Sequence, residues 1–356
     1  MKKLLILLGS VCLTVMLAVP MVASCAGPAT PSPTPGPSPT PTQETFHWKW
    51  QAAFGPGDYI TSTSIPWKIE MIEEETDGGL TIDLFAGGEI FEREEVLTAM
   101  RGGLAEIATT AMTSVAGAEP IADLAFGIPG TNRQPWGDTW ALQNMSPLSE
   151  LMREVFARHG CYFVGAHSEG PYPVHMGNVA IRKLEDWKGV KVRTTGMSAA
   201  LAEKLGAATC YFPGAEMYEA LMLGTVDVVA WSIDGVRDMN LCEVMDYLIL
   251  PPFIENISQA TIVNEDAWAS LPESYQRAIL HAERANNMVA MDFYWGEFDY
   301  CVEHADELGY EVVTLADEDI KKLQTIIMDE IWDDFAKKDA TCAEGIKIVK
   351  HWYGMD

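Results

Sequence analysis

The sequence predicts an α/β protein built from two lobes joined by a hinge, and three observations support this fold class. Short apolar runs alternate with helical patterns from about residue 46 onward, the order expected of mixed sheets covered by helices. The alternation occurs twice, with a second start near Val174. About 310 residues follow the low-complexity segment near the N-terminus, which is enough for two lobes with cores of their own.

The first lobe is predicted from short apolar strands and helical patterns that precede Gly165. In chain order these are strand 47–54, helix 58–76, strand 80–86, helix 92–101, strand 106–112, helix 135–159 and strand 161–166. The strands are bounded by turn residues, and the helical segments repeat apolar residues every three or four positions.

The second lobe follows with the same alternation. Its elements are strand 190–194, helix 198–206, strand 209–212, helix 216–224 and strand 226–231. Two long helical stretches, 272–308 and 317–350, then complete the chain as long C-terminal helices.

The chain is predicted to cross between the lobes more than once. It leaves the first lobe near Gly165 and returns near Thr261. We therefore assign residues 46–166 and 264–356 to lobe I and residues 167–263 to lobe II. Repeated crossings of this kind form a hinge between lobes.

The N-terminus has the features of an export signal. Lys2 and Lys3 precede an apolar run that ends at Val19, which is short for a membrane-spanning helix. The tetrapeptide VASC that ends at Cys25 resembles the bacterial lipobox. Residues 1–24 are then a signal peptide, and Cys25 becomes the lipidated first residue of the mature chain. An ordinary secretory signal with a chance cysteine is the alternative.

Composition restricts the partners of the folded part. Residues 25–45 are rich in Pro, Thr and Ser and are expected to form an extended tether. The formal charge of −27 becomes −29 when Lys2 and Lys3 leave with the signal, which argues against nucleic acid and anionic lipid as partners. A lipid on Cys25 would be the sole membrane attachment, because no second apolar stretch is long enough to span a bilayer.

Five cysteines remain in the folded part, at positions 161, 210, 242, 301 and 342. Their wide spacing matches neither a zinc site nor a CxxC redox pair, so core packing is expected. The sequence leaves open whether one disulfide forms, for example between Cys301 and Cys342.

Short motifs in both lobes keep a fixed order and spacing. The first-lobe motif runs from Gly87-Gly88-Glu89 through Arg93-Glu94 to Ile107. Those of the second lobe and the segment after it are LEDWKGVKVR (184–193), LGA (205–207), EMYEAL (216–221), GTVD (224–227) and WASLP (268–272). Together they resemble the DctP-like solute-binding proteins of TRAP (tripartite ATP-independent periplasmic) transporters, over about residues 46–350. The resemblance implies a class II periplasmic-binding-protein fold that encloses its ligand between the lobes.

Arg193 is the residue on which ligand binding rests in that family. A planar guanidinium at the end of a strand can hold a carboxylate with two parallel hydrogen bonds, which a lysine does not provide. The resemblance therefore implies that Arg193 binds a carboxylate. The alternative is a surface arginine paired with one of the many acids.

Four further residues are expected at the ligand site. Trp231 and the motif His175-Met176-Gly177 resemble the 2-oxo-acid-binding branch of the family, which implies that Trp231 and His175 contact the ligand. A core tryptophan and a buried structural histidine are the alternatives. Thr110 and Met112, at the end of a predicted first-lobe strand, occupy positions that face the cleft in the family.

The resemblance raises the question of a metal ion. In the 2-oxo-acid branch, a glutamate just before the tryptophan helps to hold a metal ion that bridges to the ligand, and that position is Ala230 here. A hard cation needs oxygen ligands that alanine lacks, so we expect no metal and no other cofactor. Asp227 lies on the same strand face as Trp231 and is the candidate for a replacement ligand.

The function implied by the resemblance is transport rather than catalysis. An extracytoplasmic lipoprotein would capture a small organic carboxylate, namely a 2-oxo acid, a hydroxy acid or a related monocarboxylate. It would deliver this ligand to the large and small membrane subunits of a TRAP transporter. A C4-dicarboxylate or sugar acid as ligand, a ligand sensor for a receptor, and an exported enzyme are the alternatives. Against an enzyme, the sequence lacks the GxSxG, HExxH, phosphate-loop and GxGxxG motifs.

Overall fold

The computed structural model describes residues 44–130, 136–172, 174–254 and 256–355. The predicted signal peptide, Cys25 and most of the tether therefore lie outside the described residues. Within the described part, no helix combines the length and the apolar composition needed to cross a membrane.

A five-stranded mixed sheet has the order β2-β1-β3-β10-β4. Its strands are β1 (Phe46–Gln51), β2 (Leu80–Phe85), β3 (Ile107–Thr110), β4 (Cys161–Ser168) and β10 (Ser258–Asn264). Strand β1 runs parallel to β2 and β3, whereas β10 pairs antiparallel with both β3 and β4. The backbone of β10 therefore joins two segments that are about 50 residues apart in the sequence.

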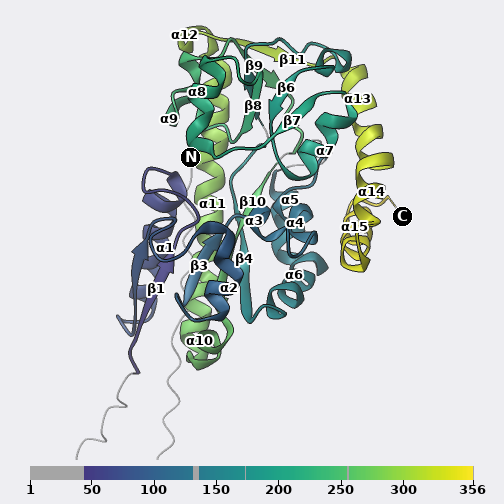
Figure 1. Cartoon of the computed structure of the whole chain (residues 1–356). Coiled ribbons are helices and arrows are strands. Elements are labelled where there is room, and N and C mark those ends of the chain that lie inside the picture. Colours follow the sequence, from purple (N-terminus) through teal and green to yellow (C-terminus); the bar gives the residue numbers. More distant parts are fainter. Residues whose placement is uncertain (1–43, 131–135, 173, 255, 356) are drawn as a thin grey trace, which may run out of the picture. The chain divides into compact units, whose positions relative to one another are not determined.

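A six-stranded mixed sheet has the order β11-β9-β5-β8-β6-β7. Its strands are β5 (Val174–Gly177), β6 (Lys191–Arg193), β7 (Ala208–Cys210), β8 (Val228–Trp231), β9 (Tyr247–Leu250) and β11 (Glu311–Thr314). Strand β5 pairs antiparallel with β8 and β9, and β6 lies parallel between β7 and β8. Figure 1 shows the strands of this sheet at the top of the view.

Helices connect the strands and cover both sheets. The α-helices of the first part of the chain are α1 (Ile65–Glu75), α2 (Val96–Arg101), α3 (Met112–Val115), α4 (Ile121–Phe126), α5 (Trp136–Met145) and α6 (Pro147–Ala157). Those of the middle are α7 (Gly196–Lys204), α8 (Met217–Met222), α9 (Gly235–Asp238) and α10 (Glu265–Ser270). The remaining ones are α11 (Glu273–Glu303), α12 (Ala305–Leu308), α13 (Asp317–Ile326), α14 (Trp332–Ala336) and α15 (Ala340–Trp352).

Short 3₁₀ and π turns complete the secondary structure. They are η1 (Ile60–Ser64), η2 (Arg93–Glu95), η3 (Leu184–Trp187), η4 (Gly214–Glu216), η5 (Leu241–Glu243) and η6 (Ile327–Ile331). Asp58, just before η1, and Arg93 and Glu94 of η2 line a cavity.

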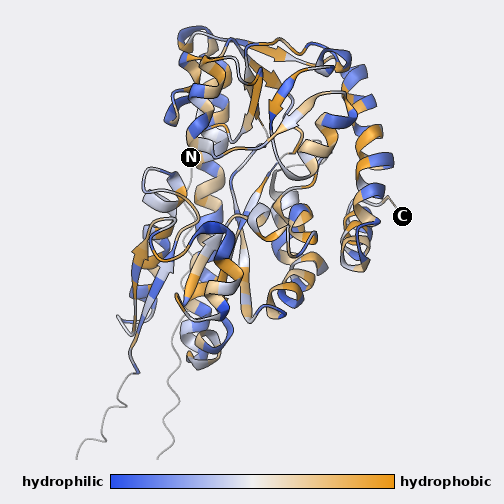
Figure 2. Ribbon diagram, viewed as in Figure 1, coloured by the Kyte–Doolittle hydropathy of each residue, from blue (hydrophilic) through white to orange (hydrophobic). Residues whose placement is uncertain are grey.

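Helix α11 contributes to the cores of both sheets. Tyr275 and Ile279, near its start, belong to the core around β1 and β2, whereas Tyr294 and Cys301, near its end, belong to the core around β5 and β8. Figure 2 shows hydrophobic residues concentrated on the strands, while the helices alternate hydrophobic and hydrophilic residues. A single continuous helix therefore ties the two cores together.

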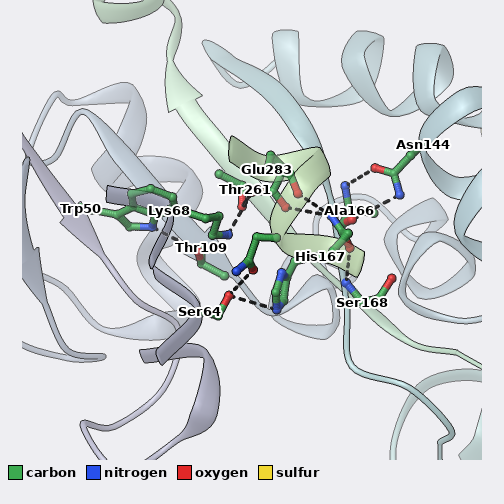
Figure 3. Close-up of polar contacts among 12 residues, drawn as sticks. Trp50, Ser64, Lys68, Thr109, Asn144, Ala166, His167, Ser168, Thr261 and Glu283 are labelled. Atoms are coloured by element: carbon green, nitrogen blue, oxygen red, sulfur yellow. Dashed lines mark hydrogen bonds and ion pairs between the residues drawn. The ribbon is translucent and has the colours of Figure 1, made fainter. Parts of the chain in front are cut away.

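A buried ion pair anchors α11 to α1. Lys68 is fully buried and lies 2.9 Å from the carboxylate of Glu283, whose Oε2 also accepts a hydrogen bond from Thr261 at 2.8 Å. The ammonium lies 5.0 Å from the ring centroid of Trp50. Figure 3 shows Lys68 and Glu283 pointing toward each other beside Thr261. The charges of both side chains are thus satisfied inside the core.

The predicted α/β class with two mixed sheets is confirmed, and several boundaries differ. The helix predicted over 135–159 is broken into α5 and α6 at Ser146-Pro147, because Ser146 caps the new helix by accepting from Leu148 N and proline stands at its first position. The long C-terminal stretch is likewise divided into α13, η6, α14 and α15. The five described cysteines are free thiols.

Two strands lie in a different sheet from the one that the predicted lobe boundaries imply. Strand β10 begins at Ser258, inside the segment assigned to lobe II, yet it pairs with β3 and β4 of the first sheet. Strand β11 falls inside the segment assigned to lobe I, yet it pairs with β9. Periodicity identifies a strand but not its neighbours, which explains both differences.

Candidate functional site

A cavity of about 460 Å³ is lined by residues from both sheets and their connections. Strands β6 and β8 bring Arg193 and Trp231 to its wall at their last residues, and the chain just after β4 brings Glu169. The loop before η1 and the start of η2 complete the wall with Asp58 and Arg93. Ligands of α/β proteins bind at such strand ends, where loops from several elements converge.

A larger groove of about 830 Å³ lies elsewhere, on α1, the turn after it and β2. Its lining includes the carboxylates of Glu70, Glu73, Glu74 and Asp77 and no lysine or arginine. An anionic ligand has no counter-ion there, so the smaller cavity is the better candidate site.

Arg193 is held rigidly at the cavity wall. It is 2% exposed, its Nε and Nη2 donate to the carbonyl of Phe212 at 3.1 and 3.0 Å, and its Nη1 donates to the carbonyl of Ala230 at 3.1 Å. The guanidinium also lies 5.0 Å from the ring centroid of Trp231. Each terminal nitrogen has a second hydrogen, and although Tyr172 also forms a side-chain hydrogen bond with Arg193, the fixed fork can still donate to a ligand.

Trp231 is fixed by two glycines. A Cβ at Gly214 would lie 2.9 Å from the indole ring, and one at Gly235 would lie 2.7 Å from it. Real side chains do not tolerate such distances, so the absence of Cβ atoms lets the indole pack between the two backbones. The ring therefore forms a rigid apolar wall beside Arg193.

Arg93 supplies a second guanidinium from the side of the first sheet. Its Nε donates to Ser114 at 2.7 Å and its Nη2 to Thr113 at 3.1 Å, and it lies over the ring of Phe54. Arg93 belongs to a motif recognised in the sequence but was not predicted as a ligand contact. Its position in that first-lobe motif, beside Glu94, was the available signal.

Five carboxyl groups outnumber the two guanidiniums in the described lining. They are Asp58, Glu94, Glu169, Asp234 and Asp238. Burial raises the pKa of Glu169 well above its usual range, and repulsion from Asp58 and Asp234 raises it further. Burial likewise raises the pKa of Asp58 to about 6.

Asp234 lies at the start of α9. Burial raises its pKa to about 7, although hydrogen bonds from Ser232 and from the backbone of Gly235 oppose this shift. The sequence analysis missed these acids as site residues, because single carboxylates in so acidic a chain form no pattern.

Comparison with known proteins decides the family. The profile described as "bacterial extracellular solute-binding protein, family 7" (DctP) matches residues 67–339, more than half of the chain. The chain belongs to the DctP family. The predicted relationship to TRAP solute-binding proteins is thereby confirmed.

Two relatives of this DctP protein have assigned ligands in their names. The monocarboxylate 2-oxoacid-binding periplasmic protein of a Nostoc species is 26% identical over 286 residues, 79% of this chain and 76% of that protein. The 2,3-diketo-L-gulonate-binding periplasmic protein of Escherichia coli is 23% identical over 287 residues, 79% of this chain and 84% of that protein.

Crystal structures confirm the fold class. A TRAP solute-binding protein of Pseudoalteromonas atlantica with bound sodium and pyruvate matches with a TM-score of 0.77 at 21% identity, covering 87% of this chain and 94% of that chain. One of Chromohalobacter salexigens with bound (S)-2-amino-1-propanol also has a TM-score of 0.77 at 21% identity, with coverages of 87% and 96%. The DctP chain therefore has the predicted bilobed periplasmic-binding fold.

Three of the predicted contact residues of this DctP protein lie outside the cavity lining. His175 is fully buried, with its ring 4.9 Å from that of Trp187 and 4.4 Å from that of Phe253, and burial lowers its pKa to about 3. Thr110 and Met112 are buried as well, and Thr113 of the same segment lines the cavity instead.

Strand register explains the position of His175. In the β5–β8 ladder, Val174 pairs with Trp231, whereas His175 pairs with Ala230. Side chains of paired residues point to the same face of a sheet, and those of successive residues along a strand alternate between faces. The side chains of His175 and Trp231 therefore point to opposite faces of this sheet. The structure therefore places His175 outside the cavity lining, on the strand face opposite Trp231, and its contact with a ligand stays a prediction.

Crystal structures of two relatives hold sodium or calcium together with pyruvate, which raises the question of which residues could hold a cation here. Asp227, the predicted replacement ligand, accepts from the backbone N of Lys191 at 2.8 Å, lies 3.7 Å from its Nζ and does not line the cavity. Ala230 contributes only its carbonyl, which accepts from Arg193. Among the described residues, no three His, Cys, Asp or Glu side chains are grouped to hold a metal ion.

Proposed function

We propose that this DctP-family protein captures a small organic carboxylate in the cavity and delivers it to the membrane subunits of a TRAP transporter. The ligand class is a 2-oxo acid, a hydroxy acid or a related monocarboxylate. Arg193 carries the proposal, because it is a buried guanidinium at the cavity wall that can still donate to a ligand. The names of the Nostoc and Escherichia coli relatives support the ligand class.

The geometry of Arg193 suits reversible capture. The carbonyls of Phe212 and Ala230 hold the guanidinium in place before a ligand arrives, so little side-chain entropy is lost on binding. The indole of Trp231 excludes water from one face and strengthens the ion pair. Closure of the lobes about the ligand would then create the shape that the membrane subunits recognise.

The proposal is tested by calorimetry and thermal shift with pyruvate, lactate and malonate. Arg193→Lys should weaken the binding of the best carboxylate by about 1.5–3 kcal/mol, the scale of a charge-assisted hydrogen bond. Arg182→Lys is the matched control, since Arg182 is exposed and pairs with Glu311 outside the cavity. Equal affinities for the two variants would remove Arg193 from the site.

Arg93 favours a second candidate ligand. A guanidinium from the first-sheet side, together with Arg193, could bind both ends of a C4-dicarboxylate or a sugar acid. Succinate and gluconate belong in the same screen for this reason. Loss of succinate but not pyruvate affinity in Arg93→Lys would select this candidate.

Membrane attachment through Cys25 is proposed from the sequence alone. Bacterial expression should give a protein that partitions into detergent, and Cys25→Ala should release it to the aqueous phase. Wild-type protein in the aqueous phase with Ala26 or a later residue as a free N-terminus would contradict a lipid anchor.

A further inference from the structure

Two buried hydrogen-bond acceptors in the cavity wall lack partners. Oε1 of Glu169 and Oε1 of Gln259 are both without a hydrogen bond, and their residues are 6% and 2% exposed. Both residues line the cavity. They come from neighbouring strands, since Gln259 of β10 pairs with His167 of β4, two residues before Glu169. Buried acceptors normally have a donor, so a donor from outside the chain is expected at this point.

A donor that also carries positive charge would offset the repulsion among the carboxyl groups around Glu169. Glu169 is close enough to Asp58 and Asp234 that each raises its pKa. The hydrogen bonds of Arg193 go to backbone carbonyls and those of Arg93 to hydroxyl groups, and the charge of Arg93 offsets only part of the repulsion at Glu169, whose pKa stays raised. The carboxyl groups around Glu169 therefore repel one another in their charged forms, and the described residues offset this repulsion only in part.

We propose that the ligand carries an ammonium group as well as a carboxylate, and that Glu169 and Gln259 bind the ammonium, with the carboxyl groups of Asp58 and Asp234 nearby, while Arg193 binds the carboxylate. This inference rests on the proposed function, because it assigns the carboxylate to Arg193. Of the ligand classes named above, it selects the related monocarboxylates, and among them a small zwitterion such as an amino acid. The cavity is then bipolar, with its cationic and anionic sides fixed by different elements.

An ammonium fits the site better than a hydroxyl group or a metal ion. It donates three hydrogen bonds and accepts none, which suits a set of acceptors. A hydroxyl group supplies one donor and no charge. A metal ion needs several oxygens at coordinating distance, and among the described residues such a group is absent.

Binding of an ammonium group should release protons from the carboxyl groups of the cavity, and this release can be measured. The pKa values of Asp58 and Asp234 are raised to about 6 and about 7, so part of each carboxyl population is protonated near neutral pH. The other titratable groups that interact with these two are Glu169, Asp238 and Tyr294. A bound ammonium lowers the carboxyl pKa values, and protons are released to the buffer.

The experiment compares three ligands that differ by one group each. L-alanine carries both charged groups, L-lactate carries the carboxylate alone, and 2-amino-1-propanol carries the ammonium alone. Each is titrated calorimetrically into the full mature chain at pH 6.5, in two buffers of different ionisation enthalpy, to count protons. The same comparison is repeated with the valine and aspartate skeletons to cover other ligand sizes.

At least one amino acid should bind tenfold or more tightly than both of its one-group partners, with release of protons. Glu169→Gln should reduce its affinity about tenfold and remove most of the advantage over the hydroxy acid. Glu119→Gln is the control, since Glu119 pairs with Arg158 and His159 outside the cavity.

The outcomes separate the two proposals. Hydroxy or oxo acids that bind as tightly as the amino acids, or that reach that affinity when Ca²⁺ or Na⁺ is added, would overturn the ammonium site and leave the carboxylate site intact. Amines without a carboxylate that bind as tightly as the amino acids would overturn the role of Arg193 and keep the ammonium site. Absence of binding in all three series would overturn both.

Discussion

Two buried glutamates, Glu283 and Glu169, have opposite surroundings. Glu283 is 3% exposed, and Lys68 and Thr261 both contact its Oε2, at 2.9 and 2.8 Å (Figure 3). Glu169 is 6% exposed, one of its oxygens has no partner, and its charged neighbours include further carboxyl groups. The chain itself completes the first site and leaves the second incomplete.

The difference separates a structural charge from a functional one. A carboxylate without a partner is costly to bury, so a fold that retains one needs a compensating interaction. The Lys68–Glu283 pair connects α1 with α11 and is satisfied in the free protein. Glu169 faces a cavity, where a compensating cation can arrive from solution.

Removal of Lys68 should change stability more than any other substitution considered, and it tests whether the Lys68–Glu283 pair is structural. Lys68→Met should lower the free energy of unfolding by about 3–5 kcal/mol, because it leaves the buried charge of Glu283 without its cation. Urea unfolding followed by tryptophan fluorescence measures the loss. The double variant Lys68→Met, Glu283→Gln should recover much of it. A loss below about 1 kcal/mol in the single variant would show that the pair is not structural.

The pH dependence of the free energy of unfolding tests the acids of the cavity through Asp234. Its raised pKa of about 7 means that the folded protein holds a proton which the unfolded chain loses near pH 4, so this group's stability contribution falls as the pH rises from 4 to 7. Asp234→Asn keeps an oxygen to cap α9 and should raise stability by about 2 kcal/mol at pH 8, and much less at pH 4.5. Equal gains at both pH values would contradict the raised pKa.

Matched substitutions of the two glutamates should have opposite signs. Glu169→Gln removes a carboxyl group whose charged form is opposed by burial and by neighbouring acids, and it should stabilise the ligand-free protein by about 1 kcal/mol in alkaline buffer. Glu283→Gln removes the counter-ion of Lys68 and should destabilise it. Thermal unfolding of both variants in the same buffer checks the signs, and a shared sign would remove the distinction between the two sites.

The sequence predicted those parts of the site that depend on motifs. Arg193 and Trp231 are at the ends of strands within a recognisable order of short segments, and the structure places both on the cavity wall. The two-sheet α/β class followed from periodicity in the same way. Both inferences use information that is local in the chain.

The sequence did not indicate which strands pair with each other or in which register. The face of His175 depends on its register against β8, and the sheet that holds β10 depends on its neighbours, so neither was predicted. The acids at 58, 169 and 234 converge from three separate segments. In a chain with 51 acidic residues, nothing marks these three until the fold brings them together.

Metal ions should have little effect on ligand binding at the cavity. If an ammonium of the ligand compensates Glu169, affinity should change less than twofold, about 0.4 kcal/mol, when Na⁺ is replaced by choline and divalent ions are removed with a chelator. A twofold limit is below the effect of any of the variants above, so the titrations need the same protein batch with and without chelator. A tenfold loss that one added metal restores would show that the acids around Glu169 hold a metal ion despite Ala230. Glu169 would then still differ from Glu283, because its partner would come from solution whether that partner is an ammonium or a metal ion. The cation would, however, be separate from the ligand.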